Sequence, residues 1–479
     1  MKKLLVMILL GGMSMGMANA QVTLSLEQAI EIALSDNPTI KVADLEIERY
    51  DYVYKQTTAS LYPQLSVSGQ YSYAAVQQKM TKGGGSLSSR SNLNATASLS
   101  IPLFAPSVYE QMKLTKTQMA MAVESARANR IEMVASVRAA YYNVLLAEQS
   151  MSVLQEAIAT TQRVVENTKE LYENGLAAEY DYITAQVQLS NLKPQVLQAQ
   201  KGIDLTKLQL KMYLSIPEET EINVIGSLDD FRNMVLLDTD YEVDLSQNTT
   251  IVNLELQSEL LEHQEKLIKT TLMPTVAAFG QISAVCMEQI DLSKLMAGMA
   301  GGGAGGNTNP DGSGETGGDA SSIMRSAAAA ATTTTTAKSP NFWWQAPITV
   351  GAQISIPIFS GFSKTNQIKA IRNQRAQLDI QREYAERGVK LQVQQAINSL
   401  LTARETMLSN ELTVEQAQKA YDIAYARYSA GAGTILELNS SQLTLTQAQL
   451  NYSQSIYDYL SAHASYEKAL GVEGVTSAE

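Results

Sequence analysis

The sequence repeats itself, and this internal duplication limits the possible folds more than any other feature of the chain. Residues 34–40 read Leu-Ser-Asp-Asn-Pro-Thr-Ile and return 211 positions later, at 245–251, as Leu-Ser-Gln-Asn-Thr-Thr-Ile. Two further motifs return at an offset of about 255 positions, Ser-Ile-Pro-(Leu/Ile)-Phe at 100–104 and 355–359 and Tyr-x-x-Gly at 172–175 and 428–431. Such self-similarity predicts two copies of one structural unit. We expect a first repeat over residues 21–216, a linker over 217–245 and a second repeat over 246–479.

The change in offset places about 44 additional residues in the second repeat, between Pro274 and Pro357. This stretch is rich in glycine and then in runs of alanine and threonine, a composition typical of flexible loops. We therefore predict a low-complexity loop over about residues 285–345. Cys286, Met296 and Met299 fall in it and are assigned no function, because two methionines without a third ligand are poor evidence for a metal site.

Alternation of apolar and small polar residues predicts two β-strands in each repeat. The pattern is clear over 65–73, 93–101 and 348–356, and weaker near 276–282, where Phe279 falls among the polar positions. Strands of about ten residues with one apolar face are typical of transmembrane barrels, although a soluble sandwich alternates in the same way. Aromatic residues at the strand ends favour the membrane interpretation, since they suit an interfacial girdle; these are Phe104, Phe359 and residues 342–344.

After each strand pair the apolar period changes to seven. The seven-residue steps run from Val137 to Tyr172 and from Val393 to Tyr428, and again along the segments that follow. This period indicates long helices packed as in coiled coils. We expect the first to run from about Ser107 to Asn174, on the order of 100 Å at 1.5 Å per residue. Gly175 and residues 431–433 are the expected turns, and Pro194 predicts a kink in the first return helix.

The first twenty residues have the pattern of a secretory signal peptide. Lys2 and Lys3 precede an apolar run over 4–10, and Ala18-Asn19-Ala20 forms a small-x-small cleavage site. The apolar run is too short for a transmembrane helix, and no later stretch of the sequence reaches that length. The chain is therefore expected to be exported, and to cross a membrane only with strands if it crosses one.

Composition argues against several functional classes. One cysteine excludes a disulfide framework, and the widely separated His263 and His463 offer no histidine-based metal site. The net charge of −12 disfavours a nucleic-acid partner. With no cluster of nucleophile, base or metal ligands, we expect no enzyme activity, no cofactor and no bound metal. An exported coiled-coil structural or adhesion protein, without channel activity, is the main alternative to a protein that crosses a membrane with its strands.

The number of strands predicts an oligomer if the chain lies in a bilayer. Four strands cannot close a barrel, and the smallest closed transmembrane barrels have eight. Two copies would give eight strands around a filled interior, whereas three would give twelve strands around a passage. The polar face carries Ser, Thr, Asn, Gln and Gly, which are small and uncharged and suit an open pore.

The sequence resembles the TolC-type outer-membrane efflux channel family over nearly the whole chain after residue 20. The resemblance rests on residues 34–38 after an amphipathic first helix, on the duplicated Ser-Ile-Pro-(Leu/Ile)-Phe junctions and on the paired Tyr-x-x-Gly hairpins. It implies a mainly α protein with transmembrane β-structure. Three internally duplicated protomers, a homotrimer, would each give four strands to a 12-stranded outer-membrane barrel, continued by a long periplasmic α-helical barrel.

The resemblance also implies partners and a location. The channel would lie in the outer membrane of a Gram-negative bacterium, in contact with its lipid, and extend into the periplasm. There it would bind a periplasmic adaptor (membrane fusion protein) that couples it to an inner-membrane RND or ABC transporter. This is the passive exit duct of a tripartite efflux pump or a type I secretion system; the exported substrate is not encoded in the duct.

The family's functional sites map onto the two predicted hairpin turns. The adaptor-docking tips would be Gly175, Leu176, Ala177, Gly431, Ala432, Gly433, Thr434 and Ile435. The periplasmic gate would include Tyr428, Glu437 and Asp181, and three Glu437 carboxylates could bind cations at the constriction. Two positions depart from the family pattern: Gly433 replaces a gating arginine, and Ser440 replaces a second acid.

Overall fold

The structure is a computed structural model that describes residues 22–76, 91–236, 244–288 and 342–472. The predicted signal peptide, most of the predicted loop, and Met296 and Met299 lie outside these residues. The described residues form two compact units. Those within Met1–Lys55, Gln111–Lys266 and Ser363–Glu479 belong to a helical unit, and those within Gln56–Glu110 and Leu267–Phe362 belong to a second unit that contains a β-sheet.

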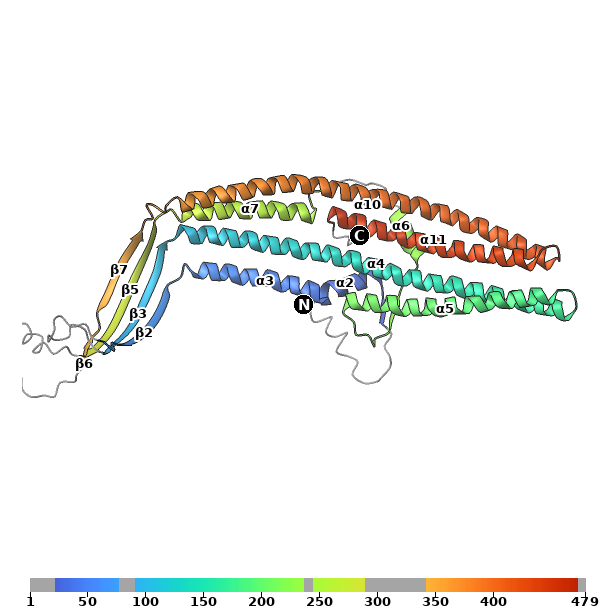
Figure 1. The fold of residues 1–479 in the computed structure, drawn as a ribbon, viewed down its shortest axis with the longest axis horizontal. Helices are drawn as coiled ribbons and strands as arrows, with labels where there is room; N and C mark the ends of the chain where they lie inside the picture. Colours follow the sequence, from blue (N-terminus) through green and yellow to red (C-terminus); the bar gives the residue numbers. More distant parts are fainter. Residues whose placement is uncertain (1–21, 77–90, 237–243, 289–341, 473–479) are drawn as a thin grey trace, which may run out of the picture. The chain divides into compact units, whose positions relative to one another are not determined.

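Two long antiparallel hairpins dominate the helical unit, in which α4 runs beside α5 and α10 beside α11 (Figure 1). The helices are α2 (Leu26–Asp36), α3 (Pro38–Ala59), α4 (Pro106–Glu173), α5 (Glu179–Leu214), α6 (Leu228–Leu236), α7 (Thr249–Thr270), α10 (Ser363–Ser429) and α11 (Ile435–Leu470). α4 has 68 residues and α10 has 67, so the predicted long helices are confirmed. None of the helices in the described ranges combines the length and the apolar character needed to cross a membrane.

The seven-residue seams lie where the helices pack. Val137 and Val144 in α4 and Val393, Leu400 and Met407 in α10 are all fully buried. The return helices bury Leu210, Leu438 and Tyr459 in the same way. A strict seven-residue period keeps these side chains on one side of a slightly underwound helix, which explains why such long helices stay packed. Pro194 lies inside α5, which continues across it as one helix; the kink remains a prediction.

The repeated motif at 34–40 and 245–251 forms the same contacts in both places. Asn37 lies before α3, where its Oδ1 accepts a hydrogen bond from the Thr39 amide at 2.8 Å while its Nδ2 donates to the Tyr213 carbonyl at 2.8 Å. Asn248 lies before α7, accepts from the Thr250 amide at 3.0 Å and donates to the Ala469 carbonyl at 2.9 Å. In each of the two places, the asparagine caps a helix and bonds it to the end of a return helix.

Residues of the predicted linker form small elements that sequence periodicity did not indicate. β1 (Val22–Leu24) pairs in parallel with β4 (Ile222–Val224). The buried Tyr141 hydroxyl of α4 donates to the Leu24 carbonyl at 3.1 Å and the Ile225 carbonyl at 2.5 Å. Arg232 of α6 bonds to the Tyr452 hydroxyl of α11 at 2.6 Å. These contacts hold the linker against the helices of both hairpins.

The second unit contains an antiparallel sheet in the order β2-β3-β5, with β6 and β7 both paired to β5. Its strands are β2 (Gln64–Tyr73), β3 (Ser91–Phe104), β5 (Thr275–Glu288), β6 (Phe342–Gln345) and β7 (Ile348–Ser355). The strand predicted over 348–356 is β7, and β6 is an additional short strand before it. Between the two, the Ser283 amide donates to the Pro347 carbonyl at 3.1 Å. β5 and β6 also extend into both ends of the predicted loop, because their ladder continues to Glu288 and Phe342.

The sheet has one polar and one apolar face, as the alternation predicts. On the polar face the Ser66 and Ser98 hydroxyls lie 2.7 Å apart, and Ser283 donates to Asn94 at 3.0 Å. Phe279, which made this strand look weak in the sequence, lies on that face opposite Gly351. A Cβ atom at Gly351 would be 3.0 Å from the Phe279 ring, so the glycine makes room for the aromatic side chain.

Candidate functional site

The two hairpin turns have the same backbone geometry. Gly175 follows α4 with φ 73° and Gly431 follows α10 with φ 71°, both in the left-handed region that favours glycine. The amide of each glycine donates to a carbonyl three residues back, and the next amide donates five residues back, to Leu171 in the first turn and Arg427 in the second. This is the Schellman arrangement that ends helices. The two predicted tips are therefore defined turns of the same type.

The predicted docking residues differ in exposure. Leu176 is 76% exposed at the first tip, as a contact residue should be. Ile435 at the second tip is only 3% exposed and packs inside the hairpin, whereas its neighbour Leu436 is 67% exposed. The apolar residue that the second tip presents is therefore Leu436, which sequence reasoning missed because both residues begin the same helix.

A buried cluster joins the two hairpins next to the turns. Val164 and Val165 of α4 and Ala185 of α5 pack with Tyr428 of α10 and with Ile435 and Leu438 of α11. Within it the Tyr428 hydroxyl lies 2.9 Å from the Thr168 Oγ1, which itself donates to the Val164 carbonyl at 2.7 Å. The tyrosine therefore donates to the threonine. This neutral hydrogen bond between α4 and α10 was not predicted, since Thr168 belongs to no recognised motif.

The predicted gate residues lie in different environments. Tyr428 is buried, which raises the pKa of its hydroxyl; the hydrogen bond to Thr168 opposes this rise and the negative charge of Asp181 adds to it. Asp181 is thus close enough to Tyr428 to influence it. Glu437 is exposed, and its Oε2 lies 3.7 Å from the Arg427 Nη2. The charge of Asp181 therefore acts on Tyr428, whereas Glu437 pairs with a different residue, Arg427.

A side chain at position 433 would be tightly packed against the end of α10. A Cβ atom there would lie 3.1 Å from the Tyr428 nitrogen and 3.2 Å from the Arg427 carbonyl carbon, at the end of α10. The expected gating arginine is absent from this position, but Arg427 supplies a guanidinium at the same tip and donates to the Ala432 carbonyl at 3.3 Å. A cation in the last helical turn is also favoured by the helix dipole.

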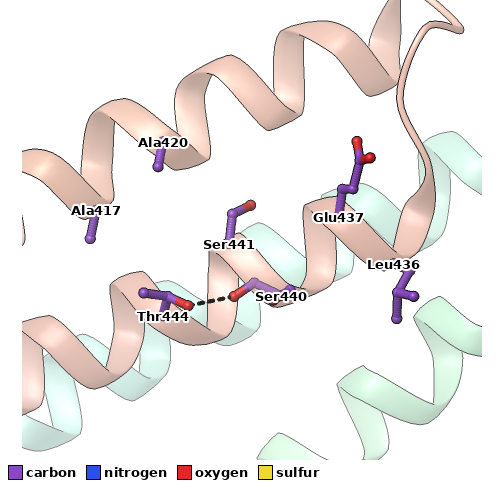
Figure 2. A pocket seen from close by; sticks show the side chains of 7 residues that line it. All are labelled: Ala417, Ala420, Leu436, Glu437, Ser440, Ser441 and Thr444. Atoms are coloured by element: carbon purple, nitrogen blue, oxygen red, sulfur yellow. Dashed lines mark hydrogen bonds between the residues drawn. The ribbon is translucent and has the colours of Figure 1, made fainter.

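A groove of about 480 Å³ runs between α10 and α11 beside this tip. Figure 2 shows Ala417 and Ala420 on α10 facing the serines of α11, and the Glu437 carboxylate at the end of the groove nearer the turn. The Thr444 hydroxyl donates to the Ser440 carbonyl at 2.9 Å, so its hydrogen bonding is satisfied within the helix. Ser440, where a second acid was expected, is one of the small residues that leave this space open.

Among the described residues there is no group of three or more His, Cys, Asp or Glu side chains that could hold a metal ion. The buried Cys286 in β5 is a free thiol. The site therefore offers hydrogen bonds, two exposed leucines and a paired acidic residue, which suit protein contact and ion passage better than covalent chemistry.

Comparisons with known proteins identify relatives over almost the full length. The chain is 22% identical to the outer membrane protein TolC of Escherichia coli over 476 residues, covering 98% of this chain and 87% of TolC. It is 22% identical to the antibiotic efflux pump outer membrane protein ArpC of Pseudomonas putida, covering 93% and 83%. The crystal structure of the outer membrane protein VceC of Vibrio cholerae is similar in fold, with a TM-score of 0.67, 16% identity and coverage of 93% and 96%.

The sequence model of the family described as outer membrane efflux protein matches residues 29–214 and 325–472, which is more than half of the chain. Members of this family are passive channels and not enzymes. The match favours a channel over an exported coiled-coil scaffold. The chain thus belongs to the outer membrane efflux protein family, and it is an efflux channel of the outer membrane that extends into the periplasm.

Proposed function

We propose that three copies of this chain assemble head to tail into one passive exit duct, in which their strands form a twelve-stranded barrel. The observation that carries this proposal is the open, two-faced sheet. Within the described residues β2 pairs only with β3, and β7 only with β5, so both outer edges keep unpaired amides and carbonyls. In a bilayer these groups need partners, which the edge of a neighbouring copy would supply. Repetition of the same contact around a ring closes it.

The apolar face of the sheet supports insertion into lipid. Leu65, Val67, Ile348, Val350 and Ile354 are each between 64% and 78% exposed in the single chain. Lipid tails would remove this surface from water, at a gain of roughly 25 cal/mol per Å². The serines, threonines and asparagines of the opposite face would then line a water-filled interior, as in other outer-membrane barrels.

The helical unit also has apolar surface that a neighbouring copy would cover. Leu197, Leu205 and Met212 of α5 are 63% to 67% exposed. Ile380, Tyr384 and Leu391 of α10 are 60% to 79% exposed. Exposed apolar patches of this kind mark interaction sites. Contact between the α5 surface of one copy and the α10 surface of the next would continue the ring as an α-helical barrel in the periplasm.

The duct would receive its cargo from other proteins. We assign adaptor docking to the tips, with Leu176 and Leu436 as the apolar contacts, and place the adaptor between this channel and an inner-membrane RND or ABC transporter. The name of ArpC, an antibiotic efflux pump protein, favours small-molecule efflux over type I secretion. Tyr428 and Asp181 would take part in closing the periplasmic end, where three copies of Glu437 would attract cations. The matching contacts of Asn37 and Asn248 support two repeats joined by the linker.

Planar-bilayer recording tests the duct directly. The protein extracted from outer membranes with detergent should have the mass of a trimer and form discrete channels. Glu437→Ala should weaken block by multivalent cations, because the ring of carboxylates is lost. The matched control is Glu415→Ala, which removes an exposed carboxylate of α10 that pairs with Lys419 and should leave block unchanged. A monomer without conductance would overturn the proposal. Equal cation block of the current in both variants would contradict the proposed role of Glu437.

Cross-linking tests the docking tips separately. In a Cys286→Ser background, Leu176→Cys should cross-link to a co-expressed adaptor, whereas Leu45→Cys should not, because Leu45 is 63% exposed in α3, which belongs to neither hairpin. Cross-linking at both positions, or at neither, would contradict tip docking while leaving the channel itself intact. Loss of small-molecule efflux without loss of protein secretion in a strain lacking the chain would identify the pump as its partner system.

A further inference from the structure

A second cleft, separate from the groove at Glu437, lies between α4 and the α10–α11 pair. It has a volume of about 270 Å³ and receives side chains from all three helices. Glu156 and Arg163 come from α4, Tyr421 and Tyr425 from α10, and Gln442 from α11. The cleft is polar on the α4 side and aromatic on the α10 side, where the two tyrosine ring centroids are 6.1 Å apart.

Gln442 lines this cleft and carries an unsatisfied acceptor. The residue is 9% exposed, and its side-chain Oε1 is buried without a hydrogen-bond partner. Buried polar atoms in folded proteins are almost always paired, because an unpaired one loses its bonds to water without replacement. A donor from outside the chain would satisfy this oxygen. Gln442 is therefore an independent indication of a ligand.

The charged groups of α4 are also available. Arg163 bonds only within its own helix, to the Ala159 carbonyl at 3.4 Å and the Thr160 hydroxyl at 3.2 Å, and neither it nor Glu156 has an ion-pair partner among the described residues. Glu156 and Arg163 are seven residues apart, which places them on one helix face about 10 Å from each other. The cleft therefore has a cation at one end, an anion at the other and an acceptor on the opposite wall.

We infer that this cleft binds a short peptide with free termini, its carboxylate on Arg163, its ammonium on Glu156 and a backbone N–H on the Gln442 Oε1. Three residues of extended chain span about 10 Å, which is close to the spacing of Glu156 and Arg163 along the helix. A single amino acid is too short to reach both. The ligand would contact both hairpins, so its binding would favour the arrangement in which they are packed together. The inference depends on the cleft alone and not on the trimer.

Calorimetric titration of the detergent-extracted protein with trialanine tests the inference. One saturable site per chain is expected. Gln442→Leu and Arg163→Gln should each weaken binding at least tenfold, and Gln442→Glu, which keeps an acceptor, should retain it. Lys169→Gln is the matched control, because Lys169 is an exposed cation of the same helix that pairs with Glu173, and it should bind as the wild type does.

The peptide termini give a second, independent comparison. N-acetyl-trialanine lacks the ammonium, so it should bind more weakly than trialanine and be insensitive to Glu156→Gln. Thermal unfolding of each variant separates loss of the fold from loss of the site. Absence of saturable binding, or equal affinity for wild type and a folded Gln442→Leu variant, would overturn the inference. Unchanged binding of the acetylated peptide would overturn the role of Glu156.

Discussion

Two residues that end the return helices of the hairpins show how strongly a single backbone angle affects stability. Ser215 ends α5 with φ 56°, and Gly471 ends α11 with φ 81°. Both amides donate to the carbonyls of the preceding turn, so both positions form the same left-handed cap. Glycine adopts this conformation without strain, whereas other residues do so at a cost of roughly 1–2 kcal/mol.

Substitutions at the two caps should therefore have opposite effects on stability. Ser215→Gly should raise the free energy of unfolding by about 1 kcal/mol. Gly471→Ala should lower it by at least about 2 kcal/mol, because its Cβ would also lie 2.5 Å from the Gln247 carbonyl oxygen. Guanidinium unfolding measures both. The control, Gly202→Ala in the interior of α5, has open space around it and should stabilise by about 0.5–1 kcal/mol. Equal losses at positions 202 and 471 would contradict the argument.

Individual contacts were the part of the site least accessible from the sequence. The family resemblance pointed to Tyr428 and Glu437, but neither Thr168 nor Arg427 belongs to a pattern that it covers. Thr168 is 260 positions from Tyr428, and only the packing of α4 against α10 brings their hydroxyls together. Arg427 looked like an ordinary helical residue because its significance depends on the close packing around Gly433 at the same tip.

At the scale of elements, the periodicity of apolar residues predicted the helices and strands that the local sequence determines. The seven-residue seams gave the long helices and their buried faces, and the period of two gave the strands and their polar face. The β1–β4 pair could not be found in this way, since three-residue strands have no detectable period and their partners are 200 positions apart in the chain. The short strand β6 was not predicted either, because four residues are too few to show a period.

Asn37 before α3 and Asn248 before α7 each join two elements, so replacing either of them should lower stability. Asn37→Ala and Asn248→Ala should each lower the free energy of unfolding by about 1–2 kcal/mol, because a helix cap and a bond to a return helix are removed together. Unfolding by guanidinium is again the measurement. Asn191→Ala, at an exposed position in α5, should change stability by no more than about 0.5 kcal/mol.

The contact between α4 and α10 should control how easily the hairpins separate. Tyr428→Phe removes a buried hydrogen bond worth about 1 kcal/mol, which corresponds to a roughly fivefold increase in the open-to-closed ratio. Thr168→Val should have a larger effect, because it leaves the tyrosine hydroxyl unpaired, and the double variant should fall short of the sum.

Single-channel open probability in planar bilayers is the measurement for these variants. Since both partners are neutral, the effect should not vary with ionic strength. Tyr180→Phe provides the control, since this tyrosine lies at the start of α5, just after the first turn, and is 70% exposed. Equal open probability in Tyr428→Phe and Tyr180→Phe would show that the bond does not hold the hairpins.

For the whole molecule, tyrosines that are fully or partly buried should set the alkaline limit of stability. Burial raises the pKa of Tyr141 and of Tyr452 from 10.0 to about 12. In the unfolded chain these hydroxyls ionise near pH 10, so the unfolded state binds fewer protons than the folded state as the pH rises further. The contribution of these two hydroxyls to the free energy of unfolding is complete below pH 10 and is lost as the pH approaches 12.

We therefore expect the free energy of unfolding of the helical unit to fall between pH 10 and pH 12. Denaturant titrations across this range, followed by circular dichroism, measure the slope. Tyr141→Phe and Tyr452→Phe should each flatten it, even though both lower stability at neutral pH by removing hydrogen bonds of their hydroxyls. A slope unchanged in both variants would show that other groups cause the alkaline loss.

The pairing of β3 with β5 has a consequence for the order in which the chain folds. Leu93 lies opposite Cys286 in this ladder, so the two strands meet only after a segment of nearly two hundred residues has been brought together. Each long hairpin, by contrast, closes through a turn of a few residues. Closing a long loop costs more entropy and is slower than forming local contacts. We expect the helices to pair soon after export, with the sheet completed late, at the membrane.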